Sequence, residues 1–499
     1  MARLLQISPS DNVAVALQAI AAGAAAAVDG ARVTASEAIP AGHKLALARI
    51  PPGADVIKYG WPIGRATADI EPGAWVHTHN VTTRLEGLLD YAYVPQPAQA
   101  RAEEFGPPPA FQGFRRADGR AGIRNELWIV VTVGCVNQAA QTLARLGSER
   151  LTGGSIEGVY ACPHPFGCGQ LGDDLRNTQK LLAGLIRHPN AGGVLVLGLG
   201  CENNAVRQQL EAAGEIDPRR VRFFNAQEVG DEIEEGLRAL EELAAYAGSF
   251  RREPCPVSDL VLGMKCGGSD GFSGITANPL VGAITDRVTA WGGTVLLTEV
   301  PEMFGAEQIL MNRARDRATF DDTVSLINNF KRYFIEHHQP IYENPAPGNK
   351  EGGITTLEEK SLGCILKGGR AAVCQVLDYG EPVTRKGLAL VNAPGNDGVS
   401  TTALVGSGAV AVLFTTGRGT PLGVPAPTIQ ISTNTPLAER KKNWIDFDAG
   451  RVISQGADPA GLGNELMQLV LDVASGRCRT RNEQNGMRDI AIFKTGVTV

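Results

Sequence analysis

The sequence predicts a multidomain α/β protein, and this prediction rests on the length of the chain and on two patterns. The chain has 499 residues, more than one hydrophobic core usually serves, so two or three domains are expected. Short segments of alternating polar and apolar residues fill residues 1–95, which is typical of a small β domain. From residue 115 onward, runs of Val, Leu and Ile alternate with segments whose apolar residues have helical spacing, as in parallel α/β sheets.

The N-terminal region, residues 1–95, is predicted to be an irregular all-β domain. Segments such as HKLALARI and AWVHTHN are separated by the turn signals PPGAD and IEPGA. Residues 96–114 contain three consecutive prolines and few large apolar side chains. We therefore expect a linker there.

The remainder is predicted to form a middle α/β domain over 115–250 and a larger α/β domain over 251–499. In the middle domain, buried strands are expected at 125–135, 158–162, 192–201 and 220–227, with helices between them. In the C-terminal domain, strands are expected at 260–268, 294–300, 370–377, 387–395, 409–417 and 427–433. A long polar helix is expected over 306–338.

Composition excludes several classes of protein. The net charge is −6 and the chain has no basic tract, so we expect no nucleic-acid partner. No apolar run approaches the roughly 20 residues of a membrane span, and the first residues lack the pattern of a signal peptide, so a cytoplasmic protein is expected. The 9 cysteines are an odd number in a large chain, which does not indicate a disulfide framework.

Cysteines follow four of the predicted strands. Cys135, Cys201 and Cys266 each end a strand, and Cys168 lies just beyond another. A single cysteine in such a place is usually a buried apolar residue. Because ligands of open α/β sheets gather at the carboxyl ends of the strands, we expect these cysteines to converge on one site, with Asn203 beside them.

Thiolate ligands of this kind favour iron or zinc. The spacing is not that of a zinc ribbon, which needs paired C-x-x-C elements. The same absence favours a mononuclear ion over an iron–sulfur cluster, although a cluster bound by three of these cysteines, with one iron open to substrate, is the alternative.

Other side chains are candidates for acid–base chemistry. His77 and His79 are two residues apart, which on a strand places both rings on one face; the alternative is a half-exposed pair at a strand end. His164 lies near Cys168, and Glu299 ends a predicted strand, where a lone carboxylate is more often a helix cap. The sequence does not separate base from metal ligand among the histidines.

Glycine-rich loops are candidates for substrate binding. None contains a P-loop or a dinucleotide fingerprint, so a polyol or an acid fits better than a nucleotide. Arg418 could bind a carboxylate in bidentate fashion, or it could be a solvated loop residue. The other candidates in these loops are Asn396, Asp397, Ser269 and Asp270.

Several stretches together resemble the altronate and galactarate dehydratases. GHKLALARI, IKYGWPIG and VHTHN are similar to the β-clip (SAF) domain of that family. FGCGQLGDD, GLGCENN, CGGSDGFSGITANP, TEVPEMFGAEQ, YENPAPGNKEGGITTLEEKSLGC and APGNDGVSTTALVGSGA resemble the rest of it. The resemblance runs essentially from end to end and is greater to the altronate branch than to the galactarate branch. Cys162 and Pro163 depart from the pattern around His164.

The resemblance implies a β-clip domain, a middle domain involved in dimerisation and a Rossmann-like C-terminal domain. It implies a cytoplasmic lyase of hexuronate catabolism, a homodimer that removes water from D-altronate to give 2-dehydro-3-deoxy-D-gluconate. It also implies dependence on Fe²⁺, with manganese as the alternative ion. A related sulfo-lyase carries the β-clip domain as a separate subunit, which favours a functional role for His77 and His79.

Other functions remain open at this stage. The galactarate branch or another hydroxy acid is the nearest alternative. A nicotinamide-dependent oxidoreductase is disfavoured because the dinucleotide fingerprint is absent. A sugar-acid-binding protein without chemistry is the remaining class.

Overall fold

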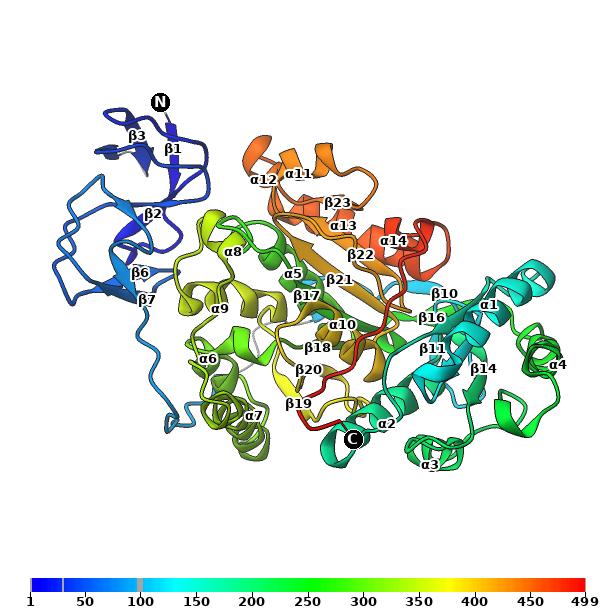
Figure 1. The fold of residues 1–499 in the computed structure, drawn as a ribbon. Coiled ribbons are helices and arrows are strands. Elements are labelled where there is room, and N and C mark those ends of the chain that lie inside the picture. The colour runs from blue at the N-terminus through cyan, green and yellow to red at the C-terminus, as the bar shows by residue number, and fades with distance from the viewer. Residues whose placement is uncertain (1, 29–30, 97–101, 499) are drawn as a thin grey trace.

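The computed structural model describes residues 2–28, 31–96 and 102–498. A parallel sheet near the C-terminus occupies the centre of the molecule, an N-terminal β module lies at one end, and a second parallel sheet lies at the other (Figure 1). The part of the linker prediction that falls on 97–101 lies outside the described residues.

The N-terminal β module, the described residues up to 96, is built from short strands joined by tight turns. Its strands pair in the orders β4-β3-β1-β2-β5-β8 and β6-β7-β9, and most pairs are antiparallel. The strands are β1 (Ala2–Leu5), β2 (Val13–Ala16), β3 (Ala25–Val28), β4 (Ala31–Thr34), β5 (Lys44–Ala46), β6 (Asp55–Lys58), β7 (Trp61–Ala66), β8 (Trp75–Val76) and β9 (Val81–Thr82).

The middle sheet is parallel, in the order β13-β12-β14-β15. Its elements are β12 (Glu126–Val131), α1 (Asn137–Leu151), β13 (Val159–Cys162), α2 (Gly172–Ile186), β14 (Ala191–Gly198), α3 (Val206–Ala213), β15 (Val221–Asn225) and α4 (Glu232–Ala247). Side chains of α1 and α4 cover one face, and side chains of α2 cover the other. Every residue of β12 and β14 is therefore buried, which explains their continuous apolar runs.

The segment that joins these parts is more regular than the sequence predicts. A small antiparallel sheet has the order β11-β10-β16, with β10 (Ala110–Arg115), β11 (Ala121–Gly122) and β16 (Arg252–Pro256). The end of the predicted linker is thus a strand, because its partner β16 comes from far along the chain and leaves no local signal.

The C-terminal sheet is also parallel, in the order β19-β20-β18-β17-β21-β22-β23. Its strands are β17 (Val261–Cys266), β18 (Thr294–Leu297), β19 (Val373–Leu377), β20 (Gly387–Val391), β21 (Ala411–Thr416), β22 (Thr428–Ser432) and β23 (Phe447–Asp448). From β17 the chain continues to β18 on one side, whereas β21 lies on the other side. The carboxyl end of β17 is therefore a topological switch point, where ligands of open α/β sheets bind.

Helices surround this sheet, and those near 306–338 differ from the prediction. The expected long helix is divided into α6 and α7, because the chain bends at 313–316 to pair beside β19. The helices are α5 (Ala277–Ala290), α6 (Glu307–Asn312), α7 (Arg317–Glu336), α8 (Pro347–Glu351), α9 (Leu357–Ile365), α10 (Asp397–Gly406), α11 (Thr435–Arg440), α12 (Arg451–Ser454), α13 (Pro459–Ala474) and α14 (Arg481–Gln484). Within the described ranges, no helix is long and apolar enough to cross a membrane.

Candidate active site

A cluster of thiol and carboxylate groups lies at the switch point of the C-terminal sheet. Cys266 is the last residue of β17, Glu302 lies in the short helix Val300–Met303 after β18, and Cys364 lies in α9. All three are buried, and one ligand atom from each lies within 4.8 Å of the others. The Sγ atoms of the cysteines are 3.2 Å apart, and Cys364 Sγ donates to Glu302 Oε2 at 2.9 Å.

Buried lysines neutralise this cluster. Lys367 Nζ lies 2.9 Å from Cys266 Sγ and 2.8 Å from Glu299 Oε2. Lys265 Nζ is paired with the other oxygen of Glu299, and Lys360 Nζ lies 2.9 Å from Glu302 Oε1. Several charges packed away from water are expensive unless they are paired, so this cluster indicates a function rather than a stable core.

The charges act on the pKa values within the cluster. Burial alone would raise the pKa of Glu302, but the charges of Lys360, Lys265 and Lys367 outweigh it and hold that pKa below its usual range. The hydrogen bond with Cys266, together with burial, raises the pKa of the Cys364 thiol well above its usual value. Glu302 is therefore an anion that accepts a hydrogen bond from the Cys364 thiol.

These donor atoms fit a transition metal ion. Thiolate and carboxylate ligands suit iron or zinc, and three protein ligands leave a coordination position open, as catalytic sites require. A bound cation would also replace the proton of Cys364 and balance the close approach of the acidic groups. Among these three residues the sequence predicted only Cys266 as a ligand. Glu302 was missed because Glu299, three residues earlier, is the carboxylate that ends the predicted strand, and Cys364 was missed because its only signal is that the family-like stretch LEEKSLGC ends in cysteine.

The cluster opens into a polar cavity of about 670 Å³. Cys266, Glu302 and Lys360 form part of its wall, and the predicted residues Arg418, Asn396 and Asp397 also line it. Asp397 begins α10, and its carboxylate lies 2.9 Å from Lys265 Nζ while its side chain is 38% exposed. Arg418 Nη2 lies 3.2 Å from Glu351. A cavity of this size with convergent charged groups suits a small hydrophilic acid.

Ser269 and Asp270 lie behind the cavity rather than in its wall. Asp270 is buried, and its carboxylate accepts hydrogen bonds from Ser273, Thr433 and Asn434. Burial raises the pKa of Asp270 despite these bonds. Asp270 therefore shapes the loop after β17.

Glu299 ends the turn after β18 and is enclosed in the cluster. It has a left-handed backbone conformation, with φ of 72°. Its carboxylate accepts the Cys266 backbone N–H at 3.3 Å in addition to the two lysines. Glu299 is thus placed beside the candidate metal ligands, but the cavity wall does not include it.

The N-terminal β module is docked onto α9 by a buried ionic triad. Lys44 Nζ and Lys58 Nζ each lie 2.8 Å from a different oxygen of Glu359. The backbone approaches closely as well, since a Cβ atom on Gly271 would lie 2.0 Å from the carbonyl oxygen of Gly42. The module is therefore packed against the loop that follows Cys266.

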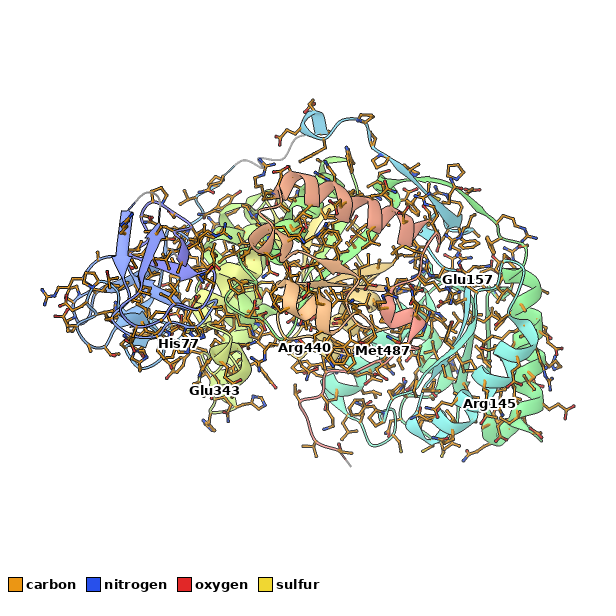
Figure 2. The ribbon with its side chains drawn as sticks, turned by 90° about the horizontal axis from the view of Figure 1, so that it is seen from above. His77, Arg145, Glu157, Glu343, Arg440 and Met487 are labelled. Atoms are coloured by element: carbon orange, nitrogen blue, oxygen red, sulfur yellow. The ribbon has the colours of Figure 1, made fainter. Side chains whose placement is uncertain are left out.

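The predicted pair of histidines lies on the side of the module that carries these contacts. His77 is buried and its Nδ1 lies 3.0 Å from Thr355 Oγ1, whereas His79 is exposed and its ring tilts against Trp75. Burial, with Lys44 and His43 nearby, lowers the pKa of His77 to about 4, so His77 is neutral near pH 7. Figure 2 shows His77 in the N-terminal module, at the opposite end of the molecule from Arg145 and Glu157.

The expectation that four strand-end cysteines converge was wrong. Cys135, Cys168 and Cys201 follow β12, β13 and β14 of the middle sheet, whereas Cys266 follows β17 of the other sheet. The strand-end pattern is the same in both domains, and the sequence does not say which strands share a sheet. Asn203 remains with the middle group, where its Oδ1 accepts the Gly169 N–H at 2.8 Å.

His164 is held by backbone groups of the middle domain. Its Nε2 lies 3.0 Å from the carbonyl oxygen of Val131, and its Nδ1 accepts the N–H of Phe166 at 3.2 Å. Burial lowers the pKa of His164 to about 4. Both nitrogens are occupied in a neutral ring, so this geometry assigns His164 a structural place in the loop before Cys168.

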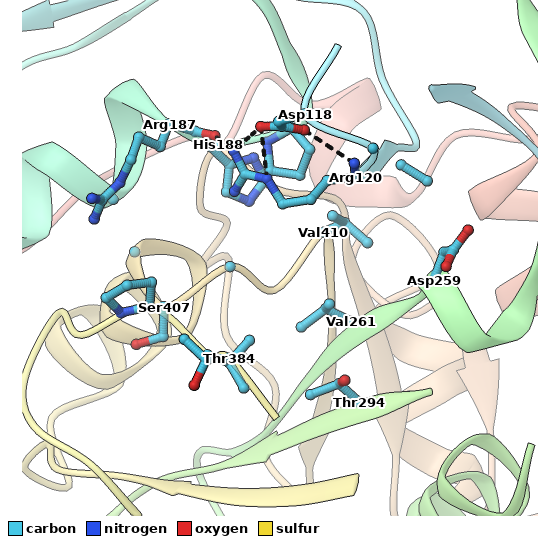
Figure 3. Close-up of a pocket in the computed structure, with 18 of the residues that line it drawn as sticks. Asp118, Arg120, Arg187, His188, Asp259, Val261, Thr294, Thr384, Ser407 and Val410 are labelled. Atoms are coloured by element: carbon cyan, nitrogen blue, oxygen red, sulfur yellow. Dashed lines mark hydrogen bonds and ion pairs between the residues drawn. The ribbon is translucent and has the colours of Figure 1, made fainter. Parts of the chain in front are cut away.

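A second cavity, of about 340 Å³, lies between the middle and C-terminal domains (Figure 3). Asp118, Arg120 and His188 face Val261 and Thr294 across it. Val261 and Thr294 are the first residues of β17 and β18, so this cavity lies at the amino ends of the strands. The cavity at Cys266 lies at the carboxyl ends and is therefore the candidate active site.

A buried cluster of acids, thiols and lysines that opens into a polar cavity defines an enzyme active site. Comparison with known proteins shows to which enzyme family the chain belongs. Models of the altronate/galactarate dehydratase family match residues 2–84 (SAF domain), 113–248 (second domain) and 257–498 (C-terminal domain).

Named enzymes match the whole length. Altronate dehydratase of Escherichia coli (strain K12) is 52% identical over 500 residues, covering 99% of each chain. Altronate dehydratase of Bacillus subtilis (strain 168) is 48% identical over 100% of each chain. Galactarate dehydratase (L-threo-forming) of E. coli is 33% identical over 92% of this chain and 90% of its own. The chain belongs to the altronate/galactarate dehydratase family. It is an enzyme of the lyase class, and its reaction is the dehydration of a sugar acid.

Proposed function

We propose that the enzyme removes water from D-altronate and releases 2-dehydro-3-deoxy-D-gluconate, and that the cavity at Cys266 is its active site. The identity of about half the residues to two altronate dehydratases supports this substrate over galactarate. The observation that carries the site is the buried group of Cys266, Glu302 and Cys364 opening into a cavity with Arg418 and Lys360 in its wall.

The proposed metal is Fe²⁺, held by Cys266, Cys364 and Glu302, with Mn²⁺ as the alternative. Two sulfur donors favour iron over manganese. When bound, such an ion supplies Lewis-acid stabilisation of the negative charge that develops as the C2 proton leaves, a contribution of several kcal/mol. Lys367 Nζ donates to Cys266 Sγ at 2.9 Å and would help to hold that ligand in place.

The residues of the cavity supply binding and proton transfer. The Arg418 guanidinium is suited to bind the substrate carboxylate in bidentate fashion. Asp397 is the more accessible carboxylate, since its side chain is 38% exposed against 4% for Glu302, and we assign it the role of base at C2. Each positioned acid or base contributes on the order of 10²–10⁴-fold.

Lys360 is the proposed acid for the departing 3-hydroxyl. Burial alone would lower the pKa of Lys360, but Glu302 and the cysteines outweigh it and the pKa is raised. Lys360 is therefore protonated at neutral pH and can donate to the oxygen that leaves as water. Asn344 Oδ1, 2.9 Å from Nζ, helps to fix its direction.

The histidines and the assembly complete the proposal. His77 is proposed to position the loop that contains Thr355. His79, at the surface of the N-terminal β module, is kept as a candidate acid or base.

The C-terminal sheet is proposed to be a Rossmann-like variant, in which β20 is inserted between β18 and β19. A homodimer is also proposed, and the edge strand β15 of the middle sheet, on which Phe223 is exposed, is the surface proposed for its contact. Cysteines without disulfides support a cytoplasmic location.

Product analysis tests the function. The enzyme, purified without oxygen, is supplied with Fe²⁺, Mn²⁺ or no metal and incubated with D-altronate or galactarate. We expect 2-dehydro-3-deoxy-D-gluconate from altronate with Fe²⁺, and little product from galactarate. Faster turnover of galactarate would assign the chain to the other branch, and binding of altronate without product under every condition would contradict the proposal.

A further inference from the structure

Three glycine–cysteine pairs lie side by side at the carboxyl edge of the middle sheet. Gly134–Cys135, Gly167–Cys168 and Gly200–Cys201 follow β12, β13 and β14, which are neighbours in the sheet. The sheet is parallel, so these strands end at the same edge. We call these cysteines the middle thiols.

The loops that carry the middle thiols contact one another directly. The Gly134 N–H donates to the Phe166 carbonyl at 2.9 Å, and the Asn204 N–H donates to the Gly167 carbonyl at 3.0 Å. A Cβ atom on Gly167 would lie 2.0 Å from the carbonyl oxygen of Thr132. A Cβ atom on Gly134 would lie 2.9 Å from the carbonyl oxygen of His164. Glycine therefore allows the close approach of the two loops, one residue before Cys135 and one residue before Cys168.

The middle thiols are exposed, which is unusual for cysteine. All the other cysteines of the chain are buried or half-buried, and free cysteine is among the most buried residue types. Next to these thiols, Gln170 Nε2 and Asn204 Oδ1 are buried without a hydrogen-bond partner. Exposed thiols in loops that contact one another, with buried unpartnered polar atoms in the same loops, are features of a binding site rather than of a packed core.

The surrounding dipoles favour an anionic ligand. Cys135, Cys168 and Cys201 precede the first turns of α1, α2 and α3, which are 15, 15 and 8 residues long. Each helix N-terminus carries a partial positive charge. The Glu202 carboxylate accepts the Leu199 and Gly200 N–H groups and the Thr132 hydroxyl, so its oxygens are held by the loop.

The spacing of the middle thiols distinguishes a site for a single metal ion from a site for an iron–sulfur cluster. Their sulfur atoms do not all lie within 4.8 Å of one another, unlike the ligand atoms of Cys266, Glu302 and Cys364. Ligands of one ion must converge on a single point, whereas cysteines of a cluster bind different irons and lie farther apart. The geometry therefore argues against a single ion bound by all three thiols, and of the two metal-site classes it leaves the cluster.

We propose that Cys135, Cys168 and Cys201 bind a [4Fe–4S] cluster and leave its fourth iron without a protein thiolate. The cluster site lies on the middle sheet and is separate from the group at Cys266 on the C-terminal sheet. The proposal stands independently of the dehydration reaction.

Cluster content tests the proposal without reference to activity. The full-length protein is reconstituted with equal amounts of Fe²⁺ and Fe³⁺ and with sulfide in the absence of oxygen. It is then desalted and analysed for iron, acid-labile sulfide and its electron paramagnetic resonance spectrum after reduction. We expect about four sulfides per chain in the unmodified protein. Cys135→Ser, Cys168→Ser and Cys201→Ser should each lose most of that sulfide.

Matched variants distinguish this site from the active-site group. Cys374→Ser, at a half-buried cysteine of β19, should retain the full sulfide content, and so should Cys266→Ser. Unmodified protein that binds iron without sulfide would overturn the proposal. Retention of the full sulfide content by the triple serine variant would overturn it as well.

Alkylation provides a measurement that needs no variant. In the reconstituted protein, the middle thiols should be protected from iodoacetamide, and oxidative removal of the cluster should make them reactive, as read by peptide mass spectrometry. Equal labelling before and after reconstitution would contradict the proposal even if a serine variant fails to fold.

Discussion

The Sγ atom of Cys266 lies 3.2 Å from the Sγ atom of Cys364, although the two residues are 98 positions apart in the chain. Cys266 is delivered by the end of a buried strand and Cys364 by a helix that packs over it. The carboxylate of Glu302 contacts both sulfurs, and lysines surround the group. Because of this contact, the strand-end residue Cys266 is part of a candidate metal centre.

Replacement of either cysteine should remove the metal and the activity together. For Cys266→Ser and Cys364→Ser we expect at least about a 100-fold loss of metal affinity and of turnover, because a ligand matters at least as much as its supporting shell. Metal analysis and product formation under anaerobic conditions measure this. Cys374→Ser is the control and should change neither quantity.

Air should inactivate the enzyme through the same pair of thiols. Their sulfurs are in contact, so oxidation should join them in a disulfide and remove both ligands. We expect activity to fall on exposure to air and to return with a dithiol reductant and Fe²⁺. Peptide mapping of the inactive protein should show the cross-linked peptides of Cys266 and Cys364; inactivation with both thiols still free would contradict this explanation.

Arg418 should act on substrate binding more than on the chemical step. Arg418→Lys retains the charge but loses the planar pair of donors that matches a carboxylate. We expect KM for altronate to rise by about tenfold or more, equivalent to about 1.4 kcal/mol, with a smaller change in kcat. Asp397→Asn should instead lower kcat by about 10² or more with little change in KM. The opposite pattern would exchange the roles of these residues.

Loss of Glu359 should loosen the N-terminal β module. Glu359→Gln leaves Lys44 and Lys58 buried without their counter-charge, and breaking a buried ion pair typically costs about 3–5 kcal/mol. The free energy of unfolding in urea should fall by an amount in that range, and limited proteolysis should release the module earlier. Asp69→Asn breaks the exposed ion pair with Arg49 and serves as the control, for which no change is expected.

Asp446 should give the stability of the C-terminal domain a pH dependence. Burial raises the pKa of Asp446 to about 6, above the value of about 3.9 in unfolded chains. The folded state therefore binds the proton more tightly, and the stabilisation present at acid pH is lost as pH rises through about 6. Between pH 5 and 7.5 this loss amounts to about 1 kcal/mol.

The variant Asp446→Asn checks this assignment. Its side chain does not titrate, so the decrease in the free energy of unfolding between pH 5 and 7.5 should be smaller by about 1 kcal/mol than in the unmodified protein. Urea titrations followed by tryptophan fluorescence measure it, since Trp444 is two residues away. An unchanged pH dependence would assign the titration to another group.

The sequence by itself determined most of the order of strands and helices and four residues of the cavity wall, namely Cys266, Asn396, Asp397 and Arg418. Buried strands such as β12 and β14 have continuous apolar runs because helices cover both of their faces. Arg418, Asn396 and Asp397 were found because loops at strand ends of α/β sheets are where ligands bind. Each of these inferences uses a pattern that is complete within a few residues of the chain.

Only the tertiary structure decided which strand ends meet. Cys201 and Cys266 have the same local pattern, yet they belong to different sheets, because sheet membership is set by contacts between distant segments. Cys364 lies on a helix with no metal-binding spacing, so its pairing with Cys266 has no local signature. The position at which a strand ends follows from local periodicity. The residues that meet at that end follow from the packing of the whole chain, and the candidate metal centre depends on this packing.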